Sequence, residues 1–238
     1  MSARKNSQKP LIVHIVNRLA IGGLETVLVE LINHMPDAHY RHAIVCITEA
    51  TDFKKRITRS DVGIFELRKR PGHEPGLYRR AWTLLRQLKP ALVHTYNIGG
   101  MELAVVARVA GVRCCVHAEH GRDASDPLGR NWKYNALRKV SRVFIDRWIA
   151  VSMDLHAWMA DTLGVSPANR VLVYNGVATG RFRHDAEVRR RLRHDLGFTE
   201  SEFLIGTIGR LDPVKNQALL IDAFADLRQR VDRGPDVT

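Results

Sequence analysis

Short runs of apolar residues alternate with stretches in which apolar side chains recur every three or four positions. The runs have the length of buried strands, and the stretches have the period of helices that bury one face. The predicted strands are 11–16, 43–47, 62–67, 91–95, 114–118, 148–151 and 171–173. The predicted helices are 24–35, 77–88, 101–109, 132–144 and 155–163. Strands that are apolar on both faces and separated by helices indicate a parallel sheet covered on both sides.

The pattern predicts an α/β fold, with a complete, Rossmann-like, doubly wound parallel sheet in an N-terminal domain over residues 10–174. A basic stretch then runs from Arg181 to His194. The alternation restarts with a strand at 203–208, a loop at 209–214 and a helix at 215–231. One strand and one helix cannot close a parallel sheet. Residues 175–238 are therefore predicted to be a linker and the truncated start of a second Rossmann-like domain.

Several classes of protein are disfavoured by what the sequence lacks. No apolar run reaches the ~18 residues of a membrane-spanning helix, and the polar, basic N-terminus has no signal-peptide core behind it. Cys46, Cys114 and Cys115 form no Cys-x-x-Cys pair, so neither a zinc cluster nor a disulfide framework is expected. We therefore expect a cytoplasmic protein in a reducing compartment.

The chain is basic, with 37 Lys and Arg against 25 Asp and Glu, a formal net charge of +12. Such a balance is compatible with nucleic acid, anionic lipid or phosphorylated substrates. For most clusters of Lys and Arg, such as Arg68-Lys69-Arg70, a solvated helix face is the favoured interpretation. Aromatic residues make up only 7% and fall mostly on apolar faces. Nucleic acid is therefore not expected as a partner, because its binding uses aromatic side chains beside Lys and Arg.

The loop 17–25 follows the first predicted strand and opens the first helix. In an open α/β sheet this loop lies at the carboxyl edge, where ligands bind. Gly22 and Gly23 permit positive φ and a close approach of a ligand to the backbone, and the helix behind them offers free N–H groups to an anion. The loop does not match the Gly-x-Gly-x-x-Gly fingerprint. A plain tight turn is the alternative.

The loop 209–216 again follows a predicted strand and opens a helix. Arg210 and Lys215 flank the expected helix N-terminus, so two cations and free amides converge on one place. A lysine in the first turn opposes the helix dipole, which suggests that an anion binds there. A surface lysine in an ordinary loop is the alternative.

The segment 117–123 ends another predicted strand in a cluster of polar residues. His117, Glu119 and His120 have the ligand types of a metal site, but His120 lies past the strand end, so convergence on a metal is not implied. A polar site at the carboxyl edge is the better interpretation, and a buried histidine beside a tight turn is the alternative. Asn97 and Ser152 also follow strands, without the Gly-x-Ser-x-Gly pattern of a hydrolase.

The predicted helix 132–144 is basic and amphipathic, and the charges around it extend over residues 130–147. Six cations accompany a single acid, Asp146, and apolar residues including Trp132 and Phe144 supply another side. The cations are Arg130, Lys133, Arg138, Lys139, Arg142 and Arg147. At about 1 kcal/mol per basic residue near an anionic leaflet, the helix could hold the protein on a membrane surface. A helix packed on the sheet is the alternative.

These motifs together resemble the retaining glycosyltransferases of family 4, which have the GT-B fold. The likeness rests on Gly209-Arg210-Leu211 with Lys215-Asn216, on Gly22-Gly23-Leu24-Glu25, and on His120-Gly121-x-Asp123. Val151-Ser152 and Val173-Tyr174-Asn175-Gly176-Val177 follow in the same order as in the family. Residues 10–42, 77–96 and 117–123 further resemble the sugar transferases associated with exosortase/PEP-CTERM exopolysaccharide systems.

The resemblance implies transfer of a sugar from a nucleotide-sugar donor to a lipid-linked or oligosaccharide acceptor, with retention of configuration and without a metal or other cofactor. Arg210 and Lys215 would hold the donor diphosphate, and two fixed cations can stabilise a departing diphosphate. His120 would lie near the donor sugar. The other expected substrate-binding residues are Gly22, Gly23, Asn97, Asp123, Ser152, Asn175, Gly209 and Asn216. A location at the inner face of the membrane would suit such an acceptor.

Two departures from the family bear on this expectation. The usual Asn-Gly-Val-Asp ends in Ala178 here, and the paired-glutamate motif would come after Thr238. The chain is therefore expected to lack most of the donor domain. A nucleotide-sugar epimerase of similar fold, a non-catalytic basic binding module and a degenerate binding subunit remain as alternatives.

Overall fold

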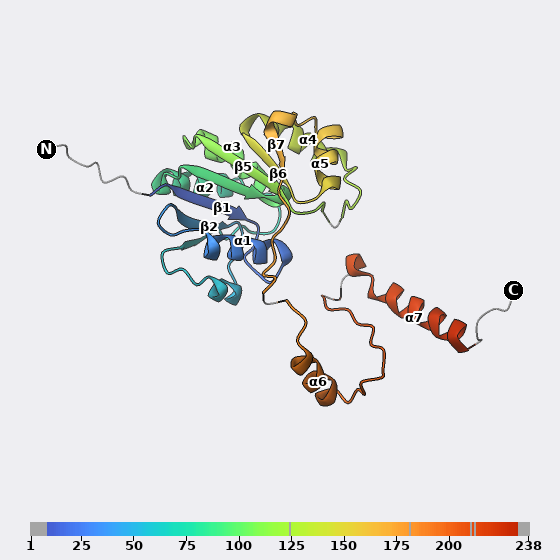
Figure 1. Ribbon diagram of the computed structural model, residues 1–238. Helices are drawn as coiled ribbons and strands as arrows, with labels where there is room; N and C mark the ends of the chain where they lie inside the picture. The colour runs from blue at the N-terminus through green and yellow to red at the C-terminus, as the bar shows by residue number, and fades with distance from the viewer. Residues whose placement is uncertain (1–8, 124, 181, 210, 212, 233–238) are drawn as a thin grey trace. The chain divides into compact units, whose positions relative to one another are not determined.

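The computed structural model describes residues 9–123, 125–180, 182–209, 211 and 213–232. Two compact units make up the chain, unit 1 over Met1–Val177 and unit 2 over Ala178–Thr238. The strands of unit 1, drawn in Figure 1, are β1 (Leu11–Val16), β2 (Arg41–Cys46), β3 (Gly63–Glu66), β4 (Leu92–Tyr96), β5 (Cys114–Glu119), β6 (Arg147–Ala150) and β7 (Arg170–Leu172). Its α-helices are α1 (Gly23–His34), α2 (Gly76–Leu88), α3 (Asn97–Val109), α4 (Trp132–Ser141) and α5 (Met153–Asp161). The seven predicted strands are confirmed.

All seven strands are parallel and form one sheet in the order β3-β2-β1-β4-β5-β6-β7. From β1 the chain proceeds to β2 and β3 on one side, then crosses back to β4 and continues outward on the other. The reversal between β1 and β4 is the switch point of a doubly wound sheet, which is where ligands bind in such folds.

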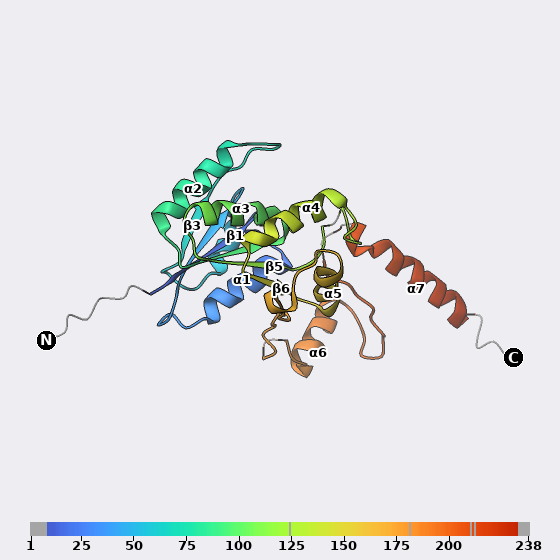
Figure 2. The same ribbon diagram turned by 90° about the horizontal axis from the view of Figure 1, so that it is seen from above.

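Helices cover both faces of this sheet. In Figure 2, α2, α3 and α4 lie side by side along one side of the sheet and α1 lies on the other. The apolar side chains of Val13, Ile15 and Val93 pack under α2 and α3. Those of Val16, Ile44 and Cys46 pack under α1. Successive side chains of a strand point to opposite faces, so the unbroken apolar runs of the sequence follow from burial on both sides.

Helix ends follow local capping chemistry. Asn131 accepts hydrogen bonds from the backbone N–H groups of Lys133 and Tyr134 and so caps α4, and the hydroxyl of Ser152 accepts from Leu155 N–H at the start of α5. The predicted helix 132–144 changes at Arg142 into a 3-10 turn, Arg142–Phe144, because the chain turns there to enter β6. Lys89 ends α2 with a φ of 46°, one residue before Pro90.

Unit 2 contains α6 (Ala186–Asp195), a 3-10 turn at Pro213–Lys215 and α7 (Gln217–Asp232). The predicted strand at 203–208 is wrong as a sheet element, since these residues join no sheet in the described structure. A strand is stabilised by its neighbours, and the described residues of unit 2 hold no second strand for it to pair with.

Candidate functional site

The predicted site residues of unit 1 gather where the strands end. Asn97 follows β4 and His120 follows β5, and Asn17, which opens the candidate loop 17–25, follows β1. Because every strand of the sheet is parallel, these residues lie at the same, carboxyl edge, and β1, β4 and β5 are neighbours in it. Ser152 lies two residues beyond the end of β6, one strand further along this edge. The sheet therefore places the switch point beside His120.

Asn97 ties two of these strand ends together. Its side-chain Oδ1 accepts a hydrogen bond of 2.7 Å from the backbone N–H of His120. Its φ is 47°, in the left-handed region that residues other than glycine rarely adopt. The turn lets α3 start directly after β4, and Gly100 then approaches β1 so closely that an added Cβ would lie 2.9 Å from the Ile15 carbonyl oxygen. Asn97 thus positions the loop that carries His120.

The imidazole of His120 is half-buried and stays neutral over a wide pH range. Burial lowers the pKa of His120 to about 4, against the opposing charge of Glu119. Its Nδ1 atom is shielded from solvent and has no hydrogen-bond partner among the described residues. A neutral imidazole offers one donor and one acceptor, so His120 presents a polar group without net charge at the strand end.

Next to His120 runs a buried network that continues into α4. His117 Nε2 lies 3.3 Å from Glu119 Oε1, and Arg138 Nε donates to the same oxygen at 2.7 Å. Burial opposes ionisation of Glu119, but the hydrogen bond from His117 and the charge of Arg138 hold its pKa below the usual value. His117 and Glu119 lie two residues apart on β5 and so share one face of the sheet. Within the described ranges no group of three or more His, Cys, Asp or Glu side chains has the arrangement of a metal site.

Burial of Arg138 also changes the interpretation of residues 130–147. Its side chain is only 2% exposed and bonds to Glu119 beneath α4, so it is not a surface cation as expected. Arg142 donates to the Leu163 carbonyl and braces the end of α5. Lys133, Lys139 and the exposed apolar side chains of Trp132 and Val140 remain on the outer surface. No helix of the described chain combines the length and apolar character needed to cross a bilayer.

The glycine pair before α1 acts differently from the expectation. Neither Gly22 nor Gly23 has a positive φ; Gly22 is extended, at −167°, and is the N-cap of the helix. What glycine supplies here is space. A Cβ on Gly22 would lie 2.1 Å from Glu25 Oε2, whereas a Cβ on Gly23 would meet nothing within 4 Å. The space beside Gly23 is what a close approach of a ligand to this loop would need.

The remaining candidates of unit 1 have local roles in this structure. The Ser152 hydroxyl is engaged as the cap of α5, and the Asp123 carboxylate accepts from Ser125 N–H and Oγ–H, which lowers its pKa. Asn175 follows β7 and is exposed. These three positions are not drawn into contact with His120 by any hydrogen bond of the described residues.

Beside the switch point lies a hollow of about 360 Å³ that the sequence analysis missed. It is lined by Asn17 from the end of β1, Thr48 beyond β2, Gly99 and Glu102 from α3, and the basic pair Lys69-Arg70. The sequence contained a signal for it, because the cluster 68–70 directly follows a predicted strand. A solvated helix face is the favoured interpretation of that cluster from the sequence, whereas Lys69 and Arg70 line the hollow.

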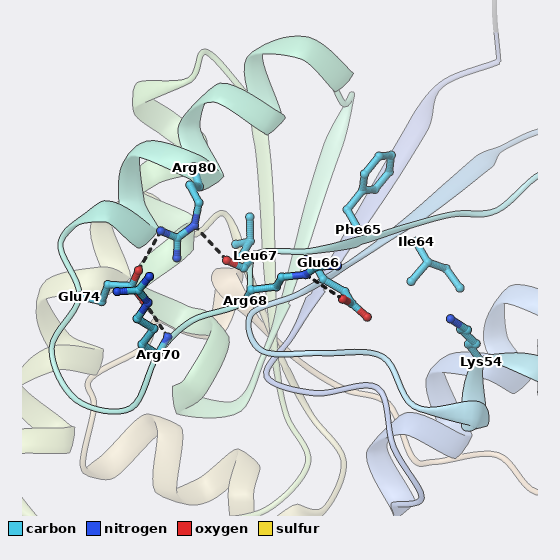
Figure 3. A pocket seen from close by; sticks show the side chains of 9 residues that line it. All are labelled: Lys54, Ile64, Phe65, Glu66, Leu67, Arg68, Arg70, Glu74 and Arg80. Atoms are coloured by element: carbon cyan, nitrogen blue, oxygen red, sulfur yellow. Dashed lines mark hydrogen bonds and ion pairs between the residues drawn. The ribbon is translucent and has the colours of Figure 1, made fainter.

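A larger hollow of about 740 Å³ is lined by residues of β3 and of the same basic turn (Figure 3). Arg70 lines both hollows. Arg80 braces the turn, donating to the Leu67 carbonyl at 2.9 Å and to Glu74 at 2.8 Å. Glu74 in turn accepts from the Arg70 backbone N–H. Arg80 of α2 and Glu74 therefore hold in place the turn that carries Arg70.

The loop 209–216 of unit 2 is described in part. Arg210 lies outside the described residues. Lys215 is exposed and ends the 3-10 turn, so it precedes α7 and does not lie in its first turn as expected. Asn216, with a φ of 45°, separates the turn from the helix. A Cβ on Gly209 would lie 3.9 Å from the Lys215 side chain, so glycine and lysine are near neighbours.

A sequence profile of Glycosyltransferase Family 4 matches residues 21–181 of the chain. Over 132 residues the chain is 33% identical to the GDP-mannose-dependent alpha-(1-6)-phosphatidylinositol monomannoside mannosyltransferase of Mycolicibacterium smegmatis. That match covers 54% of this chain and 33% of the relative.

Solved structures with the same architecture agree with the fold. The structure of Anabaena HepE with UDP and glucose superposes with a TM-score of 0.73 at 20% identity, covering 91% of this chain and 58% of that one. A UDP-N-acetylglucosamine 2-epimerase from Rickettsia bellii is more distant, with a TM-score of 0.55 at 15% identity over 81% of this chain and 52% of that one. The predicted GT-B fold is confirmed, and the chain spans about half the length of these proteins.

Proposed function

The chain belongs to Glycosyltransferase Family 4, and from this membership we propose that it forms the acceptor-side domain and the first donor-binding loop of an enzyme that transfers a sugar from a nucleotide to a saccharide acceptor. The observation that carries the proposal is the pair Asn97 and His120, joined by a hydrogen bond at the carboxyl edge of a sheet whose sequence matches that family, with Gly23 in the connection that follows β1. Ligands of open parallel sheets bind at this edge.

The acceptor occupies the hollow beside the switch point. Asn17, Thr48 and Glu102 offer hydrogen-bonding groups to sugar hydroxyls, and Lys69 and Arg70 add positive charge at its rim. Polar groups that converge in a concave site are the usual means of orienting a small ligand. The neutral His120 stands beyond Asn97 at the end of the neighbouring strand, close to where the donor sugar meets the acceptor.

The donor diphosphate binds at the loop 209–216, with Gly209 and Asn216 in the backbone turn and the cations of Arg210 and Lys215 on the phosphates. In the transfer step the bond from the anomeric carbon to the diphosphate oxygen breaks, and the acceptor oxygen bonds to that carbon and loses its proton. Negative charge develops on the departing diphosphate, and fixed cations placed there stabilise it.

The anomeric configuration of the product, the biosynthetic role of the enzyme and its acceptor can be proposed in more detail. We propose that transfer retains the anomeric configuration, that it serves exopolysaccharide synthesis, as in exosortase/PEP-CTERM systems, and that the acceptor is lipid-linked. The Mycolicibacterium relative is named for a phosphatidylinositol-based acceptor, which supports the last point. The exposed Trp132, Lys133 and Lys139 on α4 would face an anionic inner membrane surface.

The experiment compares the chain 1–238 with a longer chain that carries a complete second domain. Calorimetry with uridine and guanosine diphosphate sugars and a transfer assay are run on both. We expect weak binding and negligible transfer by 1–238, because its donor loop lacks a sheet to hold it. In the longer chain Lys215→Ala should lose about 2–4 kcal/mol of transition-state stabilisation, and Lys55→Ala, an exposed lysine paired with Asp52, serves as the control.

Wild-type transfer by the longer Lys215→Ala variant would remove the role given to that lysine. Equal transfer by the short and long chains would show that the donor site is not at 209–216. Conversion of the nucleotide sugar to its epimer in the absence of acceptor would favour the epimerase alternative.

A further inference from the structure

Four imidazoles and one phenol lie on the α1 side of the sheet, and of these only His120 has been given a role so far. His42 comes from β2, His14 from β1, His94 and Tyr96 from β4, and His120 follows β5. His14 and His42 are 1% exposed and Tyr96 is 4% exposed. Buried polar side chains cost free energy unless they are hydrogen-bonded, so this row needs an account.

The row is a continuous chain of hydrogen bonds. His42 Nδ1 lies 3.1 Å from His14 Nε2, and His14 Nδ1 lies 3.0 Å from the Tyr96 hydroxyl. The same hydroxyl lies 2.9 Å from His94 Nδ1. At its two ends, the Nε2 atoms of His42 and His94 are shielded and have no hydrogen-bond partner among the described residues.

The number of hydrogens available restricts the tautomers that the histidines of this hydrogen-bonded row can adopt. Burial keeps the histidines neutral, lowering the pKa of His94 to about 3 and that of His14 well below the usual value. A neutral imidazole carries one hydrogen, and so does a phenol. The Tyr96 hydroxyl contacts two Nδ1 atoms, so it donates to one and must accept from the other. His14 and His94 are therefore opposite tautomers.

Two arrangements satisfy this rule. Either Tyr96 donates to His94 and accepts from His14, or it donates to His14 and accepts from His94. In the first, His94 carries its hydrogen on Nε2 and His42 ends the chain with a lone pair on Nε2. In the second, these end groups are exchanged. Both arrangements hold the phenol from two sides, so the ring of Tyr96 has little freedom to move.

The ring held in this way packs against His120. The ring centroids of Tyr96 and His120 are 5.6 Å apart, and Tyr96 stacks on His94 at 4.1 Å. Asn97, the next residue, holds the His120 backbone. We propose that Tyr96, anchored by opposite tautomers of His14 and His94, is the positioning residue for the His120 side chain. The inference rests on the proposed function only for the importance of His120 to transfer.

The decisive measurement is nitrogen-15 NMR of histidine tautomers in the wild-type chain at pH 7, assigned with single histidine variants. We expect one of His14 and His94 to be protonated at Nδ1 and the other at Nε2. The same tautomer in both, or an imidazolium in either, would overturn the proposal. This readout needs no donor or acceptor, so it stands or falls separately from the transfer assay.

Two variants test the step from Tyr96 to His120. Tyr96→Phe removes the anchored hydroxyl, and we expect the pKa of His120 to rise by about 1 unit as water reaches a less firmly packed imidazole. His117 and Glu119 also act on that pKa and are left unchanged. Tyr78→Phe, which removes a hydroxyl bonded to Glu102 between α2 and α3, is the matched control.

In His14→Leu, the second variant, the phenol keeps one partner. The Tyr96 hydroxyl is a better hydrogen-bond donor than an imidazole N–H. The remaining hydrogen bond should therefore run from Tyr96 to His94 Nδ1, which leaves the hydrogen of His94 on Nε2. An unshifted His120 pKa in Tyr96→Phe, or an Nδ1-protonated His94 in His14→Leu, would contradict the positioning role.

Discussion

Burial of imidazoles in unit 1 gives stability a pH dependence at the residue scale. Desolvation lowers the pKa of His94 to about 3 and of His120 to about 4, and that of His14 also falls. The unfolded chain therefore takes up protons near pH 6.5 that the folded chain does not. Stability is complete above that pH and is lost as the pH falls below it, by about 1.4 kcal/mol per pH unit for each such histidine.

Urea unfolding between pH 5 and 8 measures this loss. His94→Gln, which cannot take up the proton, should reduce the loss between pH 6.5 and 5 by about 2 kcal/mol. Carboxylates with lowered pKa values, such as Glu119 and Asp61, lose their contribution only at lower pH. The same free energy of unfolding at pH 5 and pH 7 would show that these imidazoles are not buried neutral groups.

A second prediction at the residue scale separates the two roles of Asn97. Asn97→Ala leaves the His120 N–H without its acceptor, at about 1–3 kcal/mol, and places a Cβ-bearing residue without local hydrogen bonding at positive φ, at about 1–2 kcal/mol. Asn97→Gly loses only the acceptor, and Asn97→Asp keeps both features. Chemical unfolding should rank the variants Asp, then Gly, then Ala in falling stability. An Ala variant as stable as the Gly variant would contradict the strained φ.

Single residues also show what the sequence alone could not provide. The positions of Asn97 and His120 after strands were predictable from apolar runs, and the parallel sheet brought them together as expected. The glycine pair at 22–23 was placed correctly but explained wrongly, since its φ angles are ordinary. His14 interrupts an apolar run, yet its partners on β2 and β4 depend on strand order, which no local pattern encodes.

At the scale of elements, α4 is attached to the sheet through one buried ion pair. Arg138 is 2% exposed and Glu119 is fully buried, so removing one partner leaves an uncompensated charge in the interior. Arg138→Met or Glu119→Gln should each lower the free energy of unfolding by about 3–5 kcal/mol. The double variant Arg138→Met/Glu119→Gln should lose much less than the sum of the two single losses.

A double-mutant cycle in urea measures the coupling between the two groups. The exposed pair Lys55–Asp52 is the control and should show little coupling, because solvent screens it. Additive losses at Arg138 and Glu119 would mean that the pair does not hold α4 on the sheet.

Elements differ in how well the sequence predicts them, for a physical reason. Strands of unit 1 have apolar faces on both sides and were identified from their runs of apolar residues. The segment 203–208 has the same composition but joins no sheet, because strand formation depends on a neighbour that the segment itself does not specify. Likewise the basic pattern of 130–147 could not distinguish the surface cation Lys133 from the buried Arg138, since the pattern records only that both carry a positive charge.

On the scale of the whole molecule, the buried apolar surface that stabilises the fold lies in unit 1 among the described residues. The buried apolar clusters all consist of residues between Leu11 and Leu172, and the seven-stranded sheet closes within that range. In unit 2, apolar side chains such as Phe203, Leu211 and Ile221 are exposed. We therefore predict that residues 9–177 fold alone, with a cooperative thermal transition and the circular dichroism of an α/β protein.

Limited proteolysis of the chain 1–238 tests the same division, because segments with little buried apolar surface open at low free energy. Cleavage should occur first between residues 178 and 232 and leave a resistant fragment that contains β1 to β7.

A chain that ends at Val165 is the matched control. It lacks β7, whose backbone pairs with β6 and whose following residue, Val173, donates to the Ala150 carbonyl at 2.9 Å. This shorter chain should lose the cooperative transition because β6 becomes an open edge and the apolar cluster around Trp148 loses its cover from Leu172. A cooperative transition in the chain ending at Val165, or first cleavage within the sheet, would contradict the assignment of stability to unit 1.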